Sequence, residues 1–271
     1  MLLENKINRR PNLKISIVMS YYNRKKLLEN TLKTIVKQDY KNLEIVIVDD
    51  ASSELEKINN TIKKYDLNIK LIEINKLEKN WINPSIPNNI GFNKATGDVI
   101  LIQNPECMHH GNILKYVEKN INKNTYLNFS CYSLDQITTN VIEYDDTVIK
   151  IDDKIAHENG TNGWYNHTIY KPTGLNFCSA ITYEDLYTLG GFDERYANGL
   201  AYDDNEFLFR IKNKKMTIKY IDYPFVFHQF HEGVADRPFV AEGMAINYKI
   251  LRNQTLTSQD YDVKKYNKFY R

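Results

Sequence analysis

Short apolar runs alternate with helix-like segments through the first quarter of the chain, and this alternation constrains the fold more than any other feature. The runs at 15–19, 43–48 and 69–74 are rich in Ile, Val and Leu, as expected for strands that are buried on both faces. Between them, residues 27–36 and 55–65 place apolar side chains at a helical spacing. Strand, helix, strand, helix, strand in so short a stretch predicts an α/β fold with a parallel central sheet.

The rest of the chain continues this pattern less regularly. Residues 135–170 are polar and lack a clear period, so we expect a long loop or a hairpin there. The other expected elements are strands at 99–102, 126–133, 177–182, 217–221 and 224–227, and helices at 88–94, from 113, at 183–189, from 205 and at 241–252.

Neither an internal repeat nor a linker interrupts the chain, so one domain is the simplest division. Its 271 residues are enough for one large domain. We predict a polar N-terminal segment at 1–13, a single domain at 14–255 and a C-terminal tail at 256–271.

Charge and composition exclude some classes of protein. Lys and Arg number 36 against 34 Asp and Glu, which argues against a nucleic-acid-binding domain that works by neutralising phosphates. The three widely spaced cysteines form no metal-ligand pattern and are expected to be buried free thiols of a reducing compartment. No signal peptide and no apolar run of membrane-spanning length is found, so we expect a soluble, cytoplasmic protein.

Ligands of an open parallel sheet bind beyond the carboxyl ends of its strands, and polar side chains follow the first two strands. After the first, Tyr21 or Tyr22 can stack on a nucleobase and Arg24 can contact a phosphate. After the second, Asp49 and Asp50 can accept hydrogen bonds from a ribose or a base. The alternatives are an ordinary surface loop for the first group and a helix N-cap for the second.

Two neighbouring carboxylates stand where a late helix begins. Asp203 and Asp204 precede a helical pattern that starts at Asn205, so the helix dipole and its free N–H groups favour their ionised form. An ionised carboxylate that faces a cleft can accept a proton from a hydroxyl group. Helix capping explains one of the two aspartates equally well, but it does not explain both.

Imidazole and aromatic side chains supply further candidates. His228 and His231 follow a late strand and can bind a metal ion; the alternative is a pair of packed or surface histidines. Trp164, in a stretch that contains glycines, can cover the face of a sugar or can anchor its loop to the core. Asn176 lies shortly before the acidic segment and can shape a sugar pocket.

Several of these segments, in their order along the chain, resemble family 2 glycosyltransferases, which are inverting enzymes with the GT-A fold. The segment from Gly190 to Glu194, followed by the acidic pair and by Arg210, resembles the acceptor-side motif of that family, with Asp203 in place of the usual Glu. Residues 14–24, 43–53 and 88–106 resemble its nucleotide-binding segments. The resemblance extends over roughly residues 14–230 in total.

The resemblance implies a Rossmann-like, mostly parallel sheet with flanking helices, with a nucleotide-binding half at 14–106 and an acceptor-binding half at 107–255. It also implies transfer of a sugar from a nucleoside-diphosphate donor, for which we expect UDP, to a glycan, lipid-linked or protein acceptor. Asp204 would be the general base, and Asp203 would orient the acceptor or the donor sugar. The implied nucleotide contacts are Tyr21, Asn23, Arg24, Asp49, Asp50, Asn89, Lys94 and Asn104.

The metal motif of the family is altered in this chain. Its usual Asp-x-Asp is replaced by Asn104-Pro105-Glu106, and a neutral Asn is a weaker ligand for a hard cation than a carboxylate. We nevertheless expect Mn²⁺ or Mg²⁺, held by Glu106 and by His228, with His231 as the alternative ligand, because a departing diphosphate needs positive charge nearby.

Three other classes of protein compete with this interpretation. A nucleotidyltransferase would have a Gly-rich basic loop after the first strand, whereas residues 20–26, SYYNRKK, contain no Gly. A non-catalytic protein that binds nucleotide sugars or carbohydrates is favoured by Asn104. A zinc-binding adaptor built on His228 and His231 lacks further ligands nearby.

Overall fold

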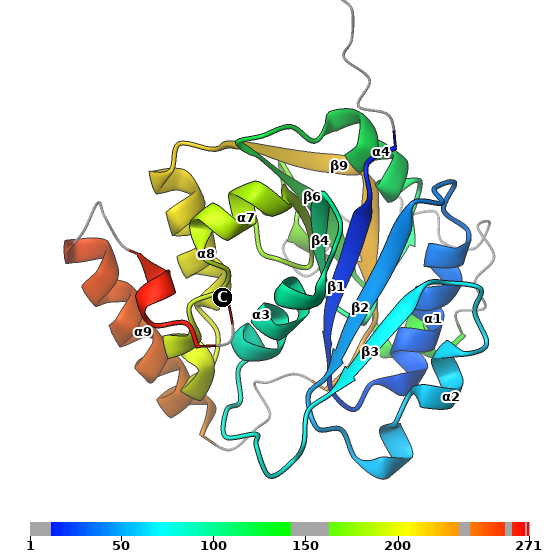
Figure 1. Cartoon of the computed structure of the whole chain (residues 1–271), viewed down its shortest axis with the longest axis horizontal. Helices are drawn as coiled ribbons and strands as arrows, with labels where there is room; N and C mark the ends of the chain where they lie inside the picture. The colour runs from blue at the N-terminus through cyan, green and yellow to red at the C-terminus, as the bar shows by residue number, and fades with distance from the viewer. Residues whose placement is uncertain (1–11, 142–162, 233–238, 258–261, 269, 271) are drawn as a thin grey trace, which may run out of the picture.

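The chain folds into a nine-stranded sheet with helices against both of its faces (Figure 1), in a computed structural model that describes residues 12–141, 163–232, 239–257, 262–268 and 270. The predicted α/β class is confirmed. The strands are β1 (Ile15–Tyr21), β2 (Leu43–Asp49), β3 (Ile69–Glu73), β4 (Val99–Gln103), β5 (Cys107–His110), β6 (Thr125–Ser133), β7 (Trp164–Asn166), β8 (Cys178–Thr182) and β9 (Thr217–His228). The α-helices are α1 (Lys25–Val36), α2 (Asn59–Ile62), α3 (Ser85–Lys94), α4 (Ile113–Asn120), α5 (Gln136–Val141), α7 (Tyr183–Leu189), α8 (Asp203–Asn213) and α9 (Val240–Thr257). Short 3-10 helices lie at Glu54–Glu56, Glu194–Asn198 and Val263–Lys265.

The strand order is β3-β2-β1-β4-β8-β6-β9-β5, and β7 pairs with β6. The pairings make β1, β2, β3, β4, β6 and β9 run in one direction, while β5, β7 and β8 run in the other. The expected mostly parallel sheet is therefore confirmed. In β1 and β2, Tyr21 lies opposite Asp49, so both strands end at the same edge and the loops after them lie side by side.

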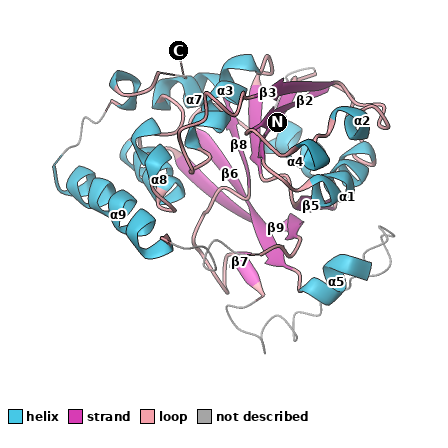
Figure 2. Ribbon diagram, turned by 90° about the horizontal axis from the view of Figure 1, so that it is seen from below, coloured by secondary structure: helices cyan, strands magenta, loops and turns pink. Residues whose placement is uncertain are grey.

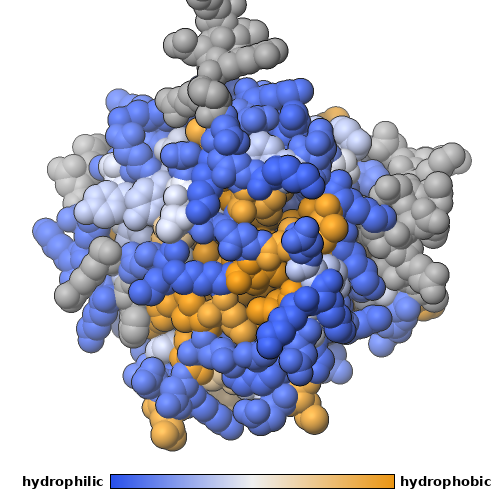
Figure 3. Space-filling model, turned by 45° about the vertical axis from the view of Figure 1, so that its right-hand side comes forward, coloured by the Kyte–Doolittle hydropathy of each residue, from blue (hydrophilic) through white to orange (hydrophobic). Residues whose placement is uncertain are grey.

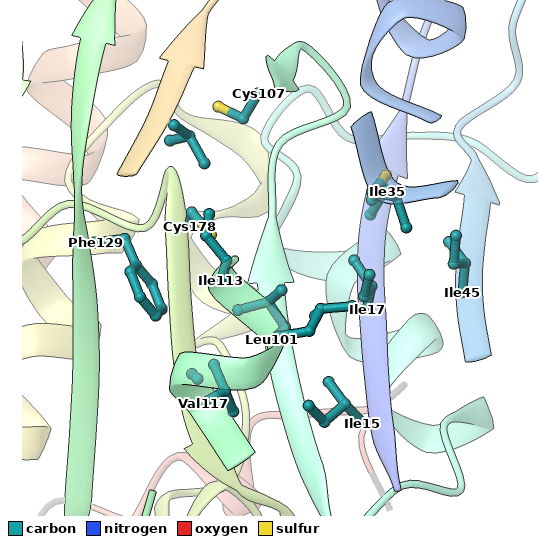
Figure 4. Packing of buried hydrophobic residues seen from close by; sticks show 14 of the residues in the cluster. Ile15, Ile17, Ile35, Ile45, Leu101, Cys107, Ile113, Val117, Phe129 and Cys178 are labelled. Carbon is teal, nitrogen blue, oxygen red and sulfur yellow. The ribbon is translucent and has the colours of Figure 1, made fainter. Parts of the chain in front are cut away.

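Apolar side chains fill both faces of the sheet. On one face, Ile17 and Leu101 of the strands pack with Ile113 and Val117 of α4 (Figure 4), and α1 adds its own apolar side to this cluster. On the other face, Phe92 of α3 belongs to a second buried cluster that includes side chains of α7 and α8. Figures 1 and 2 show α7 and α8 together and away from α1 and α2. The two layers fix the strand ends and hence the loops that follow them.

Some elements differ from the predictions. The expected helix at 55–65 is reduced to a 3-10 turn and the short α2, because Leu55 is 84% exposed and does not join the apolar side. The two expected late strands are one continuous strand, β9, and β5 was not predicted. Within 135–170 the structure contains α5 and β7, and residues 142–162 lie outside the described residues.

The end of the chain packs against the domain. Helix α9 extends to Thr257, past the predicted start of the tail. The Asn267 amide group donates hydrogen bonds to the carbonyls of Gly190 and Phe192, each at 2.7 Å, and its oxygen accepts one from the Glu194 N–H. At the other end, residues 1–11 of the predicted N-terminal segment lie outside the described residues.

The three cysteines are free and buried, as predicted. Within the part of the chain that the structure describes, no helix combines the length and the apolar character needed to cross a bilayer. Figure 3 shows one side of the molecule, on which hydrophilic side chains surround a central apolar area.

Candidate active site

A cavity of about 970 Å³ opens beyond the carboxyl ends of β1, β2 and β4. Its other walls come from the segment after β3, the start of α8 and the start of α9. Nine of the residues singled out from the sequence line it, namely Tyr22, Asn23, Arg24, Asp50, Asn104, Asn176, Asp203, Asp204 and His231. The strand-end rule therefore located the hollow that holds most of the candidate side chains.

The acidic pair lies in the first turn of α8. Asp204 Oδ1 accepts a hydrogen bond from Asn176 Nδ2 at 2.8 Å, and Asp203 Oδ1 accepts one from Asn83 Nδ2 at 2.9 Å. The N-cap position is Tyr202, whose side chain makes no capping bond. Helix capping therefore does not explain the pair, because both carboxylates line the cavity.

Burial changes the acidity of both aspartates. It raises the pKa of Asp204 to about 7, and the negative charge of Asp203 acts in the same direction, while the hydrogen bonds from Asn176 oppose it. Burial raises the pKa of Asp203 as well. A carboxylate whose pKa lies near neutrality can both accept and release a proton at physiological pH.

The loop that leads into the pair is held by α9. Asn247 Nδ2 donates hydrogen bonds to the carbonyls of Tyr196 and Ala201, at 3.1 and 2.8 Å. Gly199 permits this contact, because a Cβ atom there would lie 2.0 Å from Asn247 Oδ1. Asn247 is fully buried, and it fixes both ends of the loop that precedes Asp203.

The next acidic residue of α8, Glu206, has a structural role. Glu206 is fully buried and forms a bidentate ion pair with Arg210 at 2.6 and 2.7 Å. Gln254 Nε2 of α9 also donates to Glu206, at 2.6 Å. Because a buried charge is tolerated when it is paired and hydrogen-bonded, this group anchors α8 beneath the aspartates.

A second cluster of charged groups surrounds Glu106. Its Oε1 lies 2.9 Å from Arg24 Nη1, 3.3 Å from His228 Nε2 and 3.4 Å from His231 Nε2. Burial alone would raise the pKa of Glu106, but the Arg24 guanidinium and the two imidazoles outweigh it and hold that pKa well below its usual range. Glu106 is therefore an anion inside the protein.

These residues also fit a divalent cation. One ligand atom from each of Glu106, His228 and His231 lies within 4.8 Å of the others. Glu106 Oε2 is buried and has no hydrogen-bond partner among the described residues, as a metal-binding oxygen would. Carboxylate and imidazole are both common ligands for divalent transition metals. The two histidines that the sequence offered as alternatives converge on the same carboxylate.

On the side of the first two strands, Asp50 is the aspartate that faces the cavity. Its carboxylate accepts from Lys79 Nζ at 2.7 Å and from Trp81 Nε1 at 2.9 Å. Lys79 Nζ also lies 4.2 Å above the ring of Tyr22. Sequence reasoning missed Lys79, Trp81 and Asn83, although they follow β3 closely and the strand-end rule applies to that loop too.

Two predicted nucleotide contacts, Tyr21 and Asp49, have side chains that are buried in the core and do not line the cavity. Tyr21 is fully buried, and its hydroxyl donates to the Glu56 carbonyl at 2.6 Å. Of the two adjacent tyrosines, Tyr22 lines the cavity and is 43% exposed. Asp49 is also fully buried, and it accepts a hydrogen bond from the Ser52 N–H.

Five further candidates do not line the cavity: Glu106 and His228 of the charged cluster, and Asn89, Lys94 and Trp164. Asn89 is buried and holds the Gly-Gly segment, since its amide bonds the carbonyl and the N–H of Phe192. Lys94 is exposed at the end of α3. Trp164 is 3% exposed and packs against Tyr132 and Phe225, so it anchors its segment to the core.

Comparison with known proteins identifies the class of this chain. The family model described as "Glycosyl transferase family 2" matches residues 16–174. That is more than half of the 271 residues, and the chain belongs to this family.

Among individual proteins, the chain is similar to the poly(ribitol-phosphate) β-N-acetylglucosaminyltransferase TarP of Staphylococcus aureus, with 28% identity over 38% of this chain and 31% of TarP. It is 35% identical, over 32% of its length, to a Campylobacter jejuni GalNAc(5)-diNAcBac-PP-undecaprenol β-1,3-glucosyltransferase, of which 28% is covered. The chain thus spans about a third of the length of these curated relatives.

Solved structures share the fold. The structure of S. aureus TarS 1–349 superposes with a TM-score of 0.62 at 15% identity, over 95% of this chain and 69% of that one. The mannosyltransferase PcManGT of Pyrobaculum calidifontis, in complex with GDP-Man and Mn²⁺, gives a TM-score of 0.57 at 18% identity, over 90% and 66%. These similarities support the GT-A architecture expected from the sequence.

Proposed function

We propose that the chain is an inverting glycosyltransferase that moves a sugar from a nucleoside-diphosphate donor, UDP-linked, to an acceptor hydroxyl. The observation that carries the proposal is the shared cavity, which has the acidic pair on one wall and the basic start of α1 with His231 on another. Two of the similar proteins are named as an N-acetylglucosaminyltransferase and a glucosyltransferase, and a structure of TarS contains UDP-GlcNAc.

The donor side suits a nucleoside diphosphate. Arg24, Lys25 and Lys26 line the cavity where α1 begins, and a helix N-terminus with cationic side chains attracts phosphate groups. The exposed ring of Tyr22 can stack on a base. Asp50 can accept a hydrogen bond from a base or a ribose after Lys79 or Trp81 has moved away from its carboxylate.

In the transfer step, the acidic pair and the cation ligands have separate roles. Asp204 accepts the proton of the acceptor hydroxyl as its oxygen attacks the anomeric carbon. A new oxygen–carbon bond forms there, and the bond to the diphosphate breaks on the opposite face with its electron pair leaving on the nucleotide. Asp203, held by Asn83, orients the acceptor. A divalent cation held by Glu106, His228 and His231 would offset the charge of the diphosphate.

A donor panel tests this function. The chain is incubated with UDP-sugars and with GDP-mannose, with and without Mn²⁺, and release of the nucleoside diphosphate is measured. We expect slow release from one UDP-sugar, faster with an acceptor present. A protein that binds the nucleotide without releasing it under any of these conditions would be a binding protein rather than an enzyme.

The acidity of Asp204 predicts the pH dependence of the reaction. Since the base must be ionised and its pKa is about 7, we expect kcat/KM to rise through pH 7 and to fall roughly tenfold per pH unit below it. Asp203 and Tyr126 are the titratable groups that face Asp204. The measurement is a pH–rate profile; a rate that stays constant between pH 5 and 8 would contradict this assignment.

The loop contact of Asn247 predicts a positioning effect. Asn247→Ala removes both hydrogen bonds that hold the loop before the acidic pair, and we expect kcat to fall about tenfold while nucleotide affinity is kept. The control is Gln38→Ala, which removes a buried amide that bonds the Gly111 carbonyl and does not line the cavity. Steady-state kinetics together with melting temperatures separate the two, because only the first variant should lose turnover beyond its loss of stability.

A further inference from the structure

The cavity has two unlike walls, and the one beside the acidic pair is apolar. Ile82, Leu200, Val240 and Met244 line the cavity there; we call these four residues the apolar wall. They come from three separate segments, the stretch after β3, the loop before α8 and the start of α9. The opposite wall carries the basic residues at the start of α1.

Hydrogen bonds bring the apolar wall next to Asp203. The Ile82 N–H donates to the Ala197 carbonyl at 2.9 Å, and the next residue, Asn83, donates to Asp203 itself. The Leu200 N–H donates to the carbonyl of Gly243 at 2.9 Å, which places Leu200 beside α9. The wall therefore lies where the attacking hydroxyl must enter.

The wall exposes apolar surface that the fold itself does not bury. Ile82 is 55% exposed and Met244 is 36% exposed. Among the described side chains of α9, the buried positions are Gly243, Asn247 and Gln254, so this helix packs with small and polar residues and turns Met244 outward. Exposed apolar surface at the rim of a cavity is typical of a site that receives an apolar ligand.

Resting on the proposed function, we propose that the apolar wall is an acceptor subsite for a hydrophobic chain joined to the sugar that carries the reacting hydroxyl, as in an alkyl or polyprenyl glycoside. In the proposed function, the basic wall binds the diphosphate. The diphosphate has no apolar group that could contact the apolar wall. A chain laid along Ile82 and Met244 would leave water while its sugar stays beside Asp203 and Asp204.

The test uses pairs of acceptors that differ only in their alkyl chain. Methyl and octyl glycosides of the common hexoses and N-acetylhexosamines are titrated into the protein with UDP bound, and binding is measured by calorimetry. The glycosides are kept below their critical micelle concentration. We expect the octyl glycosides to bind at least tenfold more tightly, because each buried methylene contributes roughly a fourfold gain. For any sugar that is also a substrate, kcat/KM should show the same ratio.

Substitution of the wall decides the outcome. In the double variant Ile82→Ser and Met244→Ser, the octyl-to-methyl ratio should fall close to one, with UDP affinity kept. Leu77→Ser is the matched control, since Leu77 is 93% exposed in the same stretch but does not line the cavity; its ratio should equal that of the wild type.

Three results would overturn the subsite. They are equal binding of both glycosides, no binding of either, and a preference that survives in the double variant. A dimer in sedimentation that the wall variants dissociate would instead make the wall an interface between copies of the chain. Failure of the proposed function itself would look different, as absence of any Asp204-dependent release of UDP.

Discussion

Asp204→Asn should lower kcat by about 10²–10⁴-fold, the usual contribution of a general base, and should leave donor affinity intact. The amide keeps the size of the side chain and can still bond Asn176, but it cannot accept the proton of the acceptor. The first measurement is kcat with saturating donor and acceptor, and the second is the affinity for UDP by thermal stabilisation.

The matched control for this variant is Asp135→Asn, a carboxylate that also stands at the start of a helix, α5, but is exposed and outside the cavity lining. Its activity should match the wild type. If Asp204→Asn transfers sugar at the wild-type rate, another group is the base, and Asp203→Asn is then the variant to measure.

Glu106→Gln should have the second large effect. The carboxylate is the only negative charge in its cluster with Arg24, His228 and His231 among the described residues, so its loss removes the anion that would hold a cation. Substitution of a residue that only orients a metal ligand typically costs 10–100-fold in metal affinity or activity. Glu106 would be a ligand itself, so we expect turnover to fall at least ~100-fold.

The same variant should lose stabilisation by Mn²⁺, which is a readout that does not depend on turnover. The wild-type melting temperature should rise with Mn²⁺ and return to its starting value with a chelator, whereas Glu106→Gln should not respond. Glu56→Gln, a carboxylate that lines the cavity outside this cluster, serves as the control. A chelator-treated wild type with full activity would show that the reaction needs no metal ion and that the basic residues at the start of α1 supply the positive charge.

The sheet and the position of the cavity could be predicted from the sequence, because both follow from local patterns. Strands buried on both faces are continuous apolar runs, as at 43–48, and the strand-end rule then located Asp50 and Asn104. The acidic pair was found because two carboxylates at one helix start exceed what capping requires.

The errors arose where direction or distant packing decides the outcome. Adjacent residues such as Tyr21 and Tyr22 point to opposite sides of the chain, so a shift of one residue exchanges a core ring for a cavity ring. Trp164 is buried by Tyr132 and Phe225, which are far from it in sequence. Lys79 and Trp81 were missed because their loop carries no local signal besides its place after β3.

Helix α9 holds the loop that precedes the acidic pair, and this contact affects how such a chain can change during evolution. Asn247 and Met244 lie beyond residue 174, where the family match ends, whereas Arg24 and Asp50 lie inside it. The helix that holds the loop before the acidic pair therefore lies outside the family match, as do Asp204, His228 and His231. Under the proposed function, a change in α9 would alter acceptor preference at Met244 while Arg24 and Asp50 stay the same.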